Sequence, residues 1–165
     1  MNIVFFVQEE STGIKVKTFW PSVVASGAML LATDALSIER TLGSYMLSAC
    51  EVSTSRLAEF VYLQGSAELL LKFAETYDAK ASQLLELRIF STWLQRNVTE
   101  LRAMILGNGF IEMCNNLTEI QRTELMLKWA DGMQHYINTV DELRGSFVIP
   151  SILQVDNRLT TYLFI

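Results

Sequence analysis

Cys50, Cys114 and His135 are the residues of this 165-residue chain whose types could support nucleophilic or metal chemistry. A thiol beside a histidine can act as nucleophile and base, and Asp131, one helical turn before His135, is a candidate second metal ligand. The two cysteines form no CxxC pair, and no loop typical of an activated nucleophile surrounds either of them. We therefore expect no catalytic residue, no metal site and no cofactor, and two buried free thiols.

Phosphate and nucleic-acid chemistry have little support in the sequence. The run Gly107-Asn108-Gly109 follows a helical pattern rather than a strand and lacks the Lys and Ser/Thr of a phosphate-binding loop, so it predicts a helix end. The chain has 13 Lys+Arg against 18 Asp+Glu, a net charge of -5, and no basic run. Because phosphate binding needs clustered cations, we expect no direct nucleic-acid binding.

Half of the residues (50%) are hydrophobic and only 19% are charged, so apolar surface must be buried somewhere. The longest apolar stretch, residues 23–36, is interrupted by Ser26, Thr33 and Asp34 and is shorter than the roughly 20 residues that cross a bilayer. The first seven residues lack the basic start of a signal peptide. These patterns predict a cytoplasmic protein without membrane contact, which hides its apolar surplus in a homodimer or larger homo-oligomer.

Aromatic and acidic side chains suggest where a partner would bind. Tryptophans and tyrosines recur at or near helical core positions, which usually indicates packing and less often an interface anchor or a ligand pocket. Residues 1–78 carry 9 acidic and 5 basic residues, so this half attracts a partner with a basic surface. The predicted partner-binding residues are Tyr45, Glu51, Glu59, Tyr62 and Glu68.

The two ends of the chain resemble β-hairpins in their patterning. Residues 3–7 and 14–19 are two β-rich runs around a polar segment, and Ile14, Val16 and Thr18 alternate with lysines. Near the other end, residues 147–149, 152–155 and 159–165 read as extended segments with a turn at Asp156-Asn157.

The middle of the chain has helical periodicity. A helix is predicted from Pro21 to Leu36, a second one capped by Ser37, and a third one capped within residues 53–55. Asp78 can cap a fourth helix that reaches Ile105, and the capping box of Thr118 and Gln121 starts a fifth that continues to Gly145.

Terminal hairpins around a helical middle predict an α+β fold. In it, the amino-terminal and carboxy-terminal β-hairpins form a small antiparallel sheet that packs on about five α-helices. No repeat, low-complexity tract or polar linker divides the chain, so residues 1–165 are expected to form a single domain.

With no catalytic or metal motif, the sequence favours a protein that acts through a contact surface. The first hypothesis is a small acidic intracellular domain that occupies a partner surface as an inhibitor, immunity or adaptor protein. The alternative is a small-molecule-binding or sensor module with an aromatic pocket among the helices. An enzyme that uses Cys50, Cys114 or His135 is the least favoured hypothesis.

Overall fold

The computed structural model describes the backbone of residues 13–90 and 92–162, and the side chains of residues 20–90 and 92–146. These residues form helices and connecting turns, with no strand among them. The expected α+β fold is therefore wrong. The helices are α1 (Gly13–Ala49), α2 (Thr54–Tyr77), α3 (Ala79–Leu85), the π-helical η1 (Glu86–Phe90), α4 (Trp93–Leu106), α5 (Phe110–Asn116) and α6 (Glu119–Tyr162).

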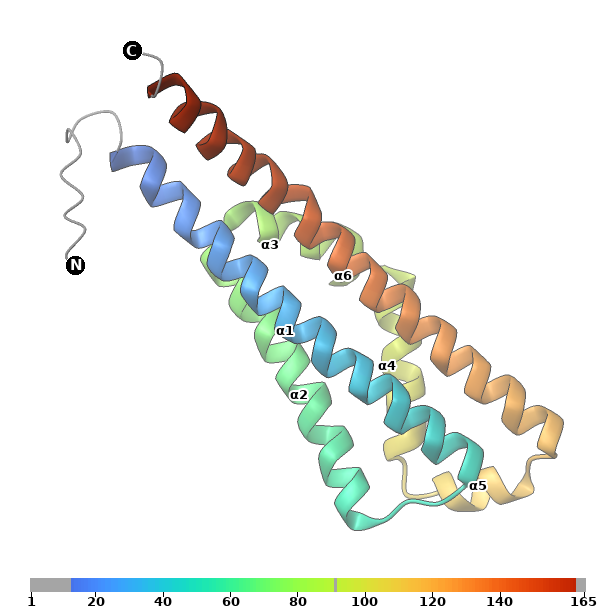
Figure 1. Ribbon diagram of the computed structural model, residues 1–165. Helices are drawn as coiled ribbons and strands as arrows, with labels where there is room; N and C mark the ends of the chain where they lie inside the picture. The colour runs from blue at the N-terminus through green and yellow to red at the C-terminus, as the bar shows by residue number, and fades with distance from the viewer. Residues whose placement is uncertain (1–12, 91, 163–165) are drawn as a thin grey trace.

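Four of these helices, α1, α2, α4 and α6, form an elongated bundle (Figure 1). The long helices α1 and α6 lie side by side and antiparallel, and α2 packs along α1. Helix α4 packs against α6, while the short α5 closes the end of the bundle at which α1 finishes. The start of α1 and the end of α6 therefore lie at the same end of the bundle.

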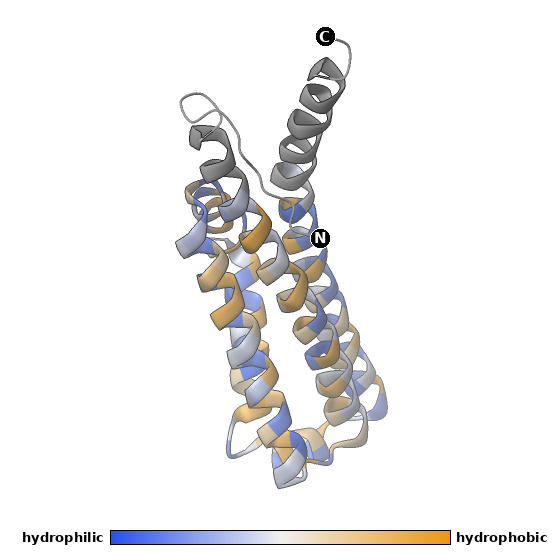
Figure 2. Ribbon diagram, turned by 60° about the vertical axis from the view of Figure 1, so that its left-hand side comes forward, coloured by the Kyte–Doolittle hydropathy of each residue, from blue (hydrophilic) through white to orange (hydrophobic). Residues whose placement is uncertain are grey.

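Helix α1 supplies the centre of the core. Its buried side chains recur three or four residues apart, which places them on one helix face. Residues 20–49 are long and apolar enough to cross a membrane by length and composition alone. The inner face of α1 packs against α2 and α6, but 44% of this window is buried, and Leu31, Ile38 and Tyr45 of the same helix are exposed. Figure 2 shows hydrophobic and hydrophilic residues interleaved along the helices, as amphipathic packing requires.

A close contact between α1 and α6 depends on Gly43. A Cβ atom at this position would lie 2.5 Å from the indole ring of Trp129, so only glycine leaves room for the ring. Trp129 is fully buried, and its Nε1 donates a hydrogen bond of 2.9 Å to the carbonyl oxygen of Arg40. Gly43 thus allows the indole ring of Trp129 on α6 to pack directly against the backbone of α1.

Three of the predicted helix caps are confirmed. The Ser53 hydroxyl accepts a hydrogen bond from the backbone N–H of Arg56 at the start of α2. The Asp78 carboxylate accepts from two backbone N–H groups at the start of α3. Thr118 and Gln121 form the reciprocal bonds of a capping box before α6.

Other helix boundaries differ from the prediction. Ser37 caps no second helix, because its hydroxyl donates to the carbonyl oxygen of Thr33 inside a continuous α1. The helix predicted from Asp78 to Ile105 is divided, since α3 and η1 end at Phe90 and α4 begins at Trp93.

Both predicted hairpins are wrong wherever the structure describes them. Helix α1 begins at Gly13, so residues 14–19 are helical and Pro21 lies inside the helix. Helix α6 runs through Gly145 to Tyr162, so residues 147–162 are helical as well. Residues 3–7 and 163–165 lie outside the described residues. Local alternation of β-branched residues is a weak preference, and the context of a long helix pair overrides it.

The expectation of two free thiols is also wrong. Cys50, directly after α1, and Cys114, in α5, form a disulfide with a Cα–Cα distance of 5.6 Å. The bond joins positions 64 residues apart in the sequence and ties α5 to the end of α1. Cys50 has a positive φ of 52°, a conformation that non-glycine residues adopt rarely, at the point where the chain leaves α1.

Candidate functional site

A polar layer crosses the apolar interior of the bundle, and each of the four long helices contributes to it. Glu39 comes from α1, Glu68 from α2, Arg102 from α4 and Tyr136 from α6. Glu39 and Arg102 stand where the helical periodicity of their helices calls for core residues. We call these four residues the charged layer.

The centre of this layer is a forked ion pair between Arg102 and Glu39. Nε and Nη2 of Arg102 donate to the two carboxylate oxygens of Glu39, each over 2.7 Å. The exposed fractions of the two residues are 2% and 0%. A pair with two parallel short hydrogen bonds satisfies the buried charge of each partner, which an unpaired residue could not do here.

The other side of the guanidinium reaches the surface of the bundle. Nη1 of Arg102 donates to Oε1 of Glu68 over a longer distance, 3.2 Å. The Glu68 side chain is 46% exposed, and its Oε1 also accepts from Nε2 of Gln64 at 3.2 Å. Arg102 therefore holds one carboxylate firmly inside the bundle and a second one at its edge.

Electrostatics keep the layer in a defined protonation state. Burial disfavours the charge on Arg102, but the hydrogen bonds and charge of Glu39 outweigh that effect and raise the pKa of Arg102. Burial also raises the pKa of Tyr136, to about 12, although the charge of Arg102 opposes this rise. At neutral pH Arg102 is thus a cation, and Tyr136 is a neutral phenol.

The predicted partner-binding residues lie on α1, on the connector after it and on α2, and only Glu68 belongs to the charged layer. Tyr45 lies near the end of α1 under the guanidinium of Arg56, whose Cζ is 4.1 Å from the ring centroid. Tyr62 on α2 is 71% exposed. Glu51, in the connector after α1, and Glu59, on α2, are exposed as well. The role of these five residues in binding stays a prediction.

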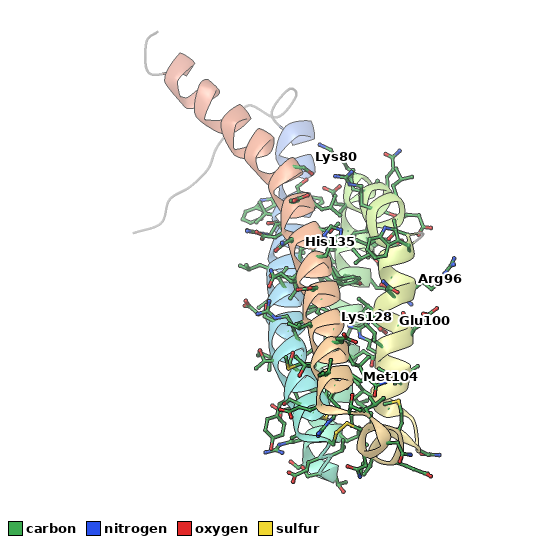
Figure 3. The ribbon with its side chains drawn as sticks, turned by 90° about the vertical axis from the view of Figure 1, so that its right-hand side faces the viewer. Lys80, Arg96, Glu100, Met104, Lys128 and His135 are labelled. Carbon is green, nitrogen blue, oxygen red and sulfur yellow. A yellow bond between two sulfur atoms is a disulfide. The ribbon has the colours of Figure 1, made fainter. Side chains whose placement is uncertain are left out.

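The aromatic residues divide between core and surface. Trp129 and Tyr136 are buried, as their positions predict, whereas Trp20 and Trp93 are 60% and 63% exposed. Trp93 stacks on the exposed His135, with the ring centroids 6.0 Å apart. Figure 3 shows His135 on α6, with α4 beside this helix. Within the described residues, no group of His, Cys, Asp and Glu is suited to hold a metal ion.

A cavity of about 250 Å³ lies at the disulfide end of the bundle, between the start of α2 and the end of α4. Its lining carries no charged side chain. Thr54 and Asn108 are its polar side chains, so the lining holds no cation that could compensate the charge of a small anion. The residues around the cavity are Val52, Thr54, Leu57, Ile105, Leu106, Gly107, Asn108, Phe110 and Ile111.

Sequence reasoning missed Glu39, Arg102 and Tyr136. A signal was present, because Glu39 follows Leu36 by three residues and Arg102 follows Val98 by four, so each charge falls on an apolar stripe. A charged residue at a core position is almost always paired, and two such residues of opposite sign form a candidate pair.

Comparison with known proteins assigns the family. A model of the family described as "Nitrate and nitrite sensing" matches residues 4–147, which is most of the chain and includes the whole charged layer. The chain belongs to this nitrate- and nitrite-sensing family. Searches of curated proteins and of solved structures find no match.

Membership of a sensing family corrects the first hypothesis from the sequence. The interpretation as an inhibitor, immunity or adaptor protein is wrong, and the alternative of a sensor module agrees with the family. The family description names sensing and no reaction, which is consistent with the expectation of a non-enzymatic domain.

Proposed function

We propose that this domain senses nitrate or nitrite by binding the anion at Arg102, inside the helical bundle. The observation that carries the proposal is a buried guanidinium in a chain of the nitrate- and nitrite-sensing family. Arg102 is the one buried cation among the described side chains. The guanidinium already pairs with the carboxylates of Glu39 and Glu68, so a bound anion takes the place of one of them. A buried cation holds such a partner more strongly than an exposed one, because little water screens it.

The chemistry of a guanidinium suits these anions. Nitrate and nitrite each present two oxygens in one plane, as a carboxylate does, and the planar N–H fork of arginine pairs with such oxygens two at a time. Glu39 demonstrates this geometry on the Nε and Nη2 side of Arg102. The charged layer touches all four long helices, so a change in it can be passed along the bundle.

Isothermal titration calorimetry of the folded domain with nitrate and nitrite tests the proposal, and chloride and sulfate serve as comparison anions. We expect saturable binding of nitrate or nitrite, and its loss in Arg102→Lys, which keeps the charge but not the fork. Arg96→Lys is the matched control, because Arg96 lies on the same helix and points away from the bundle (Figure 3). Equal binding by both variants would contradict the proposal.

The location of the domain can be proposed from its disulfide. Disulfides form and persist in oxidising compartments and are rare in the cytosol, so the bond between Cys50 and Cys114 favours an extracytoplasmic domain over the predicted cytoplasmic one. Mass spectrometry of the protein from its native compartment, with free thiols alkylated, measures whether the bond is formed there.

The predicted homo-oligomer remains a prediction with one supporting observation. Leu31, Ile38 and Tyr45 follow each other at seven-residue spacing along α1 and are 56%, 51% and 40% exposed. Apolar residues at this spacing form the contact seam of paired helices. Binding to another protein with a basic surface has no such support.

A further inference from the structure

We infer that Glu68 is an internal competitor of the sensed anion, which binds by replacing the Glu68 carboxylate at Nη1 of Arg102. The inference rests on the proposed function, since it assumes that nitrate or nitrite binds at Arg102. It adds a regulatory role for Glu68 and a link between anion binding and the contact of α2 with α4.

The two carboxylates on Arg102 differ in how readily they can leave. Glu39 is fully buried and makes two hydrogen bonds of 2.7 Å, so its departure would leave an unpaired charge in the core. Glu68 makes one hydrogen bond to Arg102, at 3.2 Å, and nearly half of its side chain already faces solvent. Ion pairs of this exposed kind contribute little to stability. An incoming anion therefore displaces Glu68 and leaves Glu39 in place.

Replacement of one anionic group by another preserves the electrostatics of the site. The guanidinium keeps one partner inside the bundle and one at its edge, so no additional charge is buried. The planar carboxylate group that leaves resembles nitrate in shape, and the Glu68 side chain needs only to rotate toward water. Gln64 Nε2, which donates to Oε1 of Glu68, lies where it can donate to the new anion instead.

The exchange also changes how the helices are connected. The bond from Arg102 to Glu68 joins α4 to α2, while the fork to Glu39 joins α4 to α1. When the anion takes the place of Glu68, the first connection is lost and the second remains. Anion binding is thereby converted into the loss of the ion pair that joins α2 to α4.

Nitrate and nitrite titrations of the wild-type domain, Glu68→Ala and Glu59→Ala test this inference. Glu59 is an exposed carboxylate on the same helix, so its variant changes the net charge equally but leaves Arg102 untouched. In Glu68→Ala the anion no longer has to break an exposed ion pair of ordinary strength. We therefore expect this variant to bind the anion about two- to fivefold more tightly. We expect unchanged affinity in Glu59→Ala, and circular dichroism checks that all three proteins are folded.

The outcomes separate the two proposals. Tighter binding in Glu68→Ala alone supports the competitor role. If the wild-type domain binds the anion but Glu68→Ala binds no more tightly than Glu59→Ala, Glu68 is not a competitor and the proposed sensing site stands. If neither the wild-type domain nor Glu68→Ala binds nitrate or nitrite, the proposed function itself is overturned.

Discussion

The charged layer and the disulfide end of the bundle connect helices in different ways. At the disulfide end, a covalent bond fixes α5 to the end of α1, and the neighbouring cavity has no charged lining. In the charged layer, by contrast, the helices meet through two ion pairs, and the half-exposed one between Arg102 and Glu68 is the pair that we propose to exchange. Glu39 lies 11 residues before Cys50, which directly follows α1, and this separation corresponds to about 16 Å along the helix axis. One end of the bundle is thus fixed, while the layer can respond to a ligand.

Loss of Arg102 should produce the largest effect on stability. In Arg102→Met, Glu39 keeps its buried position without its partner, which costs about 3–5 kcal/mol of unfolding free energy. Urea unfolding of the variant measures this loss. In the double variant Glu39→Gln, Arg102→Met we expect much of the stability to return, and a double variant no more stable than the single one would contradict the pairing.

The pH dependence of Arg102→Met sharpens this prediction. Burial raises the pKa of the Glu39 carboxyl above the ordinary value of 4.5, although the hydrogen bonds and charge of Arg102 lower it. Without the guanidinium this opposing effect is lost, so we expect a larger rise and a folded state that favours the protonated form. In the variant, the contribution of the Glu39 carboxyl to the free energy of unfolding should be fully present below pH 4.5. It should be lost as the pH rises through the raised pKa.

Removal of the disulfide should come next in size and act only on stability. Closure of a loop with a sequence separation of 64 corresponds to about 4 kcal/mol in the chain-entropy model, and measured values are commonly about 2–4 kcal/mol. We expect this loss in Cys50→Ala, Cys114→Ala by urea unfolding. Nitrate affinity should stay at the wild-type value, because the charged layer keeps all its contacts. A large loss of affinity in the folded variant would show that the two regions are coupled.

Tyr136 should give the smallest of the three effects, and only at alkaline pH. Its pKa is raised from 10.0 to about 12, so the folded state favours the neutral phenol. This preference contributes about 2–3 kcal/mol to the free energy of unfolding. The contribution is complete below pH 10 and is lost as the pH rises from 10 to about 12. Urea unfolding of the wild-type protein and Tyr136→Phe at several pH values measures this effect. The unfolding free energy of Tyr136→Phe should fall less than that of the wild type at alkaline pH. Parallel curves for the two proteins would contradict the burial of a neutral phenol.

The sequence predicts the local features of this fold better than its global class. The caps at Ser53, Asp78 and Thr118 are confirmed because a cap depends on a hydroxyl or carboxylate and the few residues after it. The ends of the long helices could not be predicted in the same way. Residues 14–19 alternate like a strand but are part of α1, whose length depends on packing that lies far away in the sequence.

Most of the candidate site also depends on long-range contacts. Glu39 and Arg102 are 63 residues apart, and Glu68 was expected to face solvent or a partner rather than Arg102. Their core positions in the helical periodicity could have identified them as buried charges. The disulfide could not have been found this way, since two isolated cysteines 64 residues apart have no spacing motif.

The most direct test of anion binding at Arg102 is a nitrate titration followed by NMR of the ¹⁵N-labelled arginine side chains. Arg102→Lys assigns the Arg102 signals, and the exposed Arg96 on the same helix serves as an internal control. We predict that the Nη signals of Arg102 shift and saturate with nitrate concentration, while those of Arg96 stay constant. Saturable nitrate binding with unchanged Arg102 signals would contradict the account.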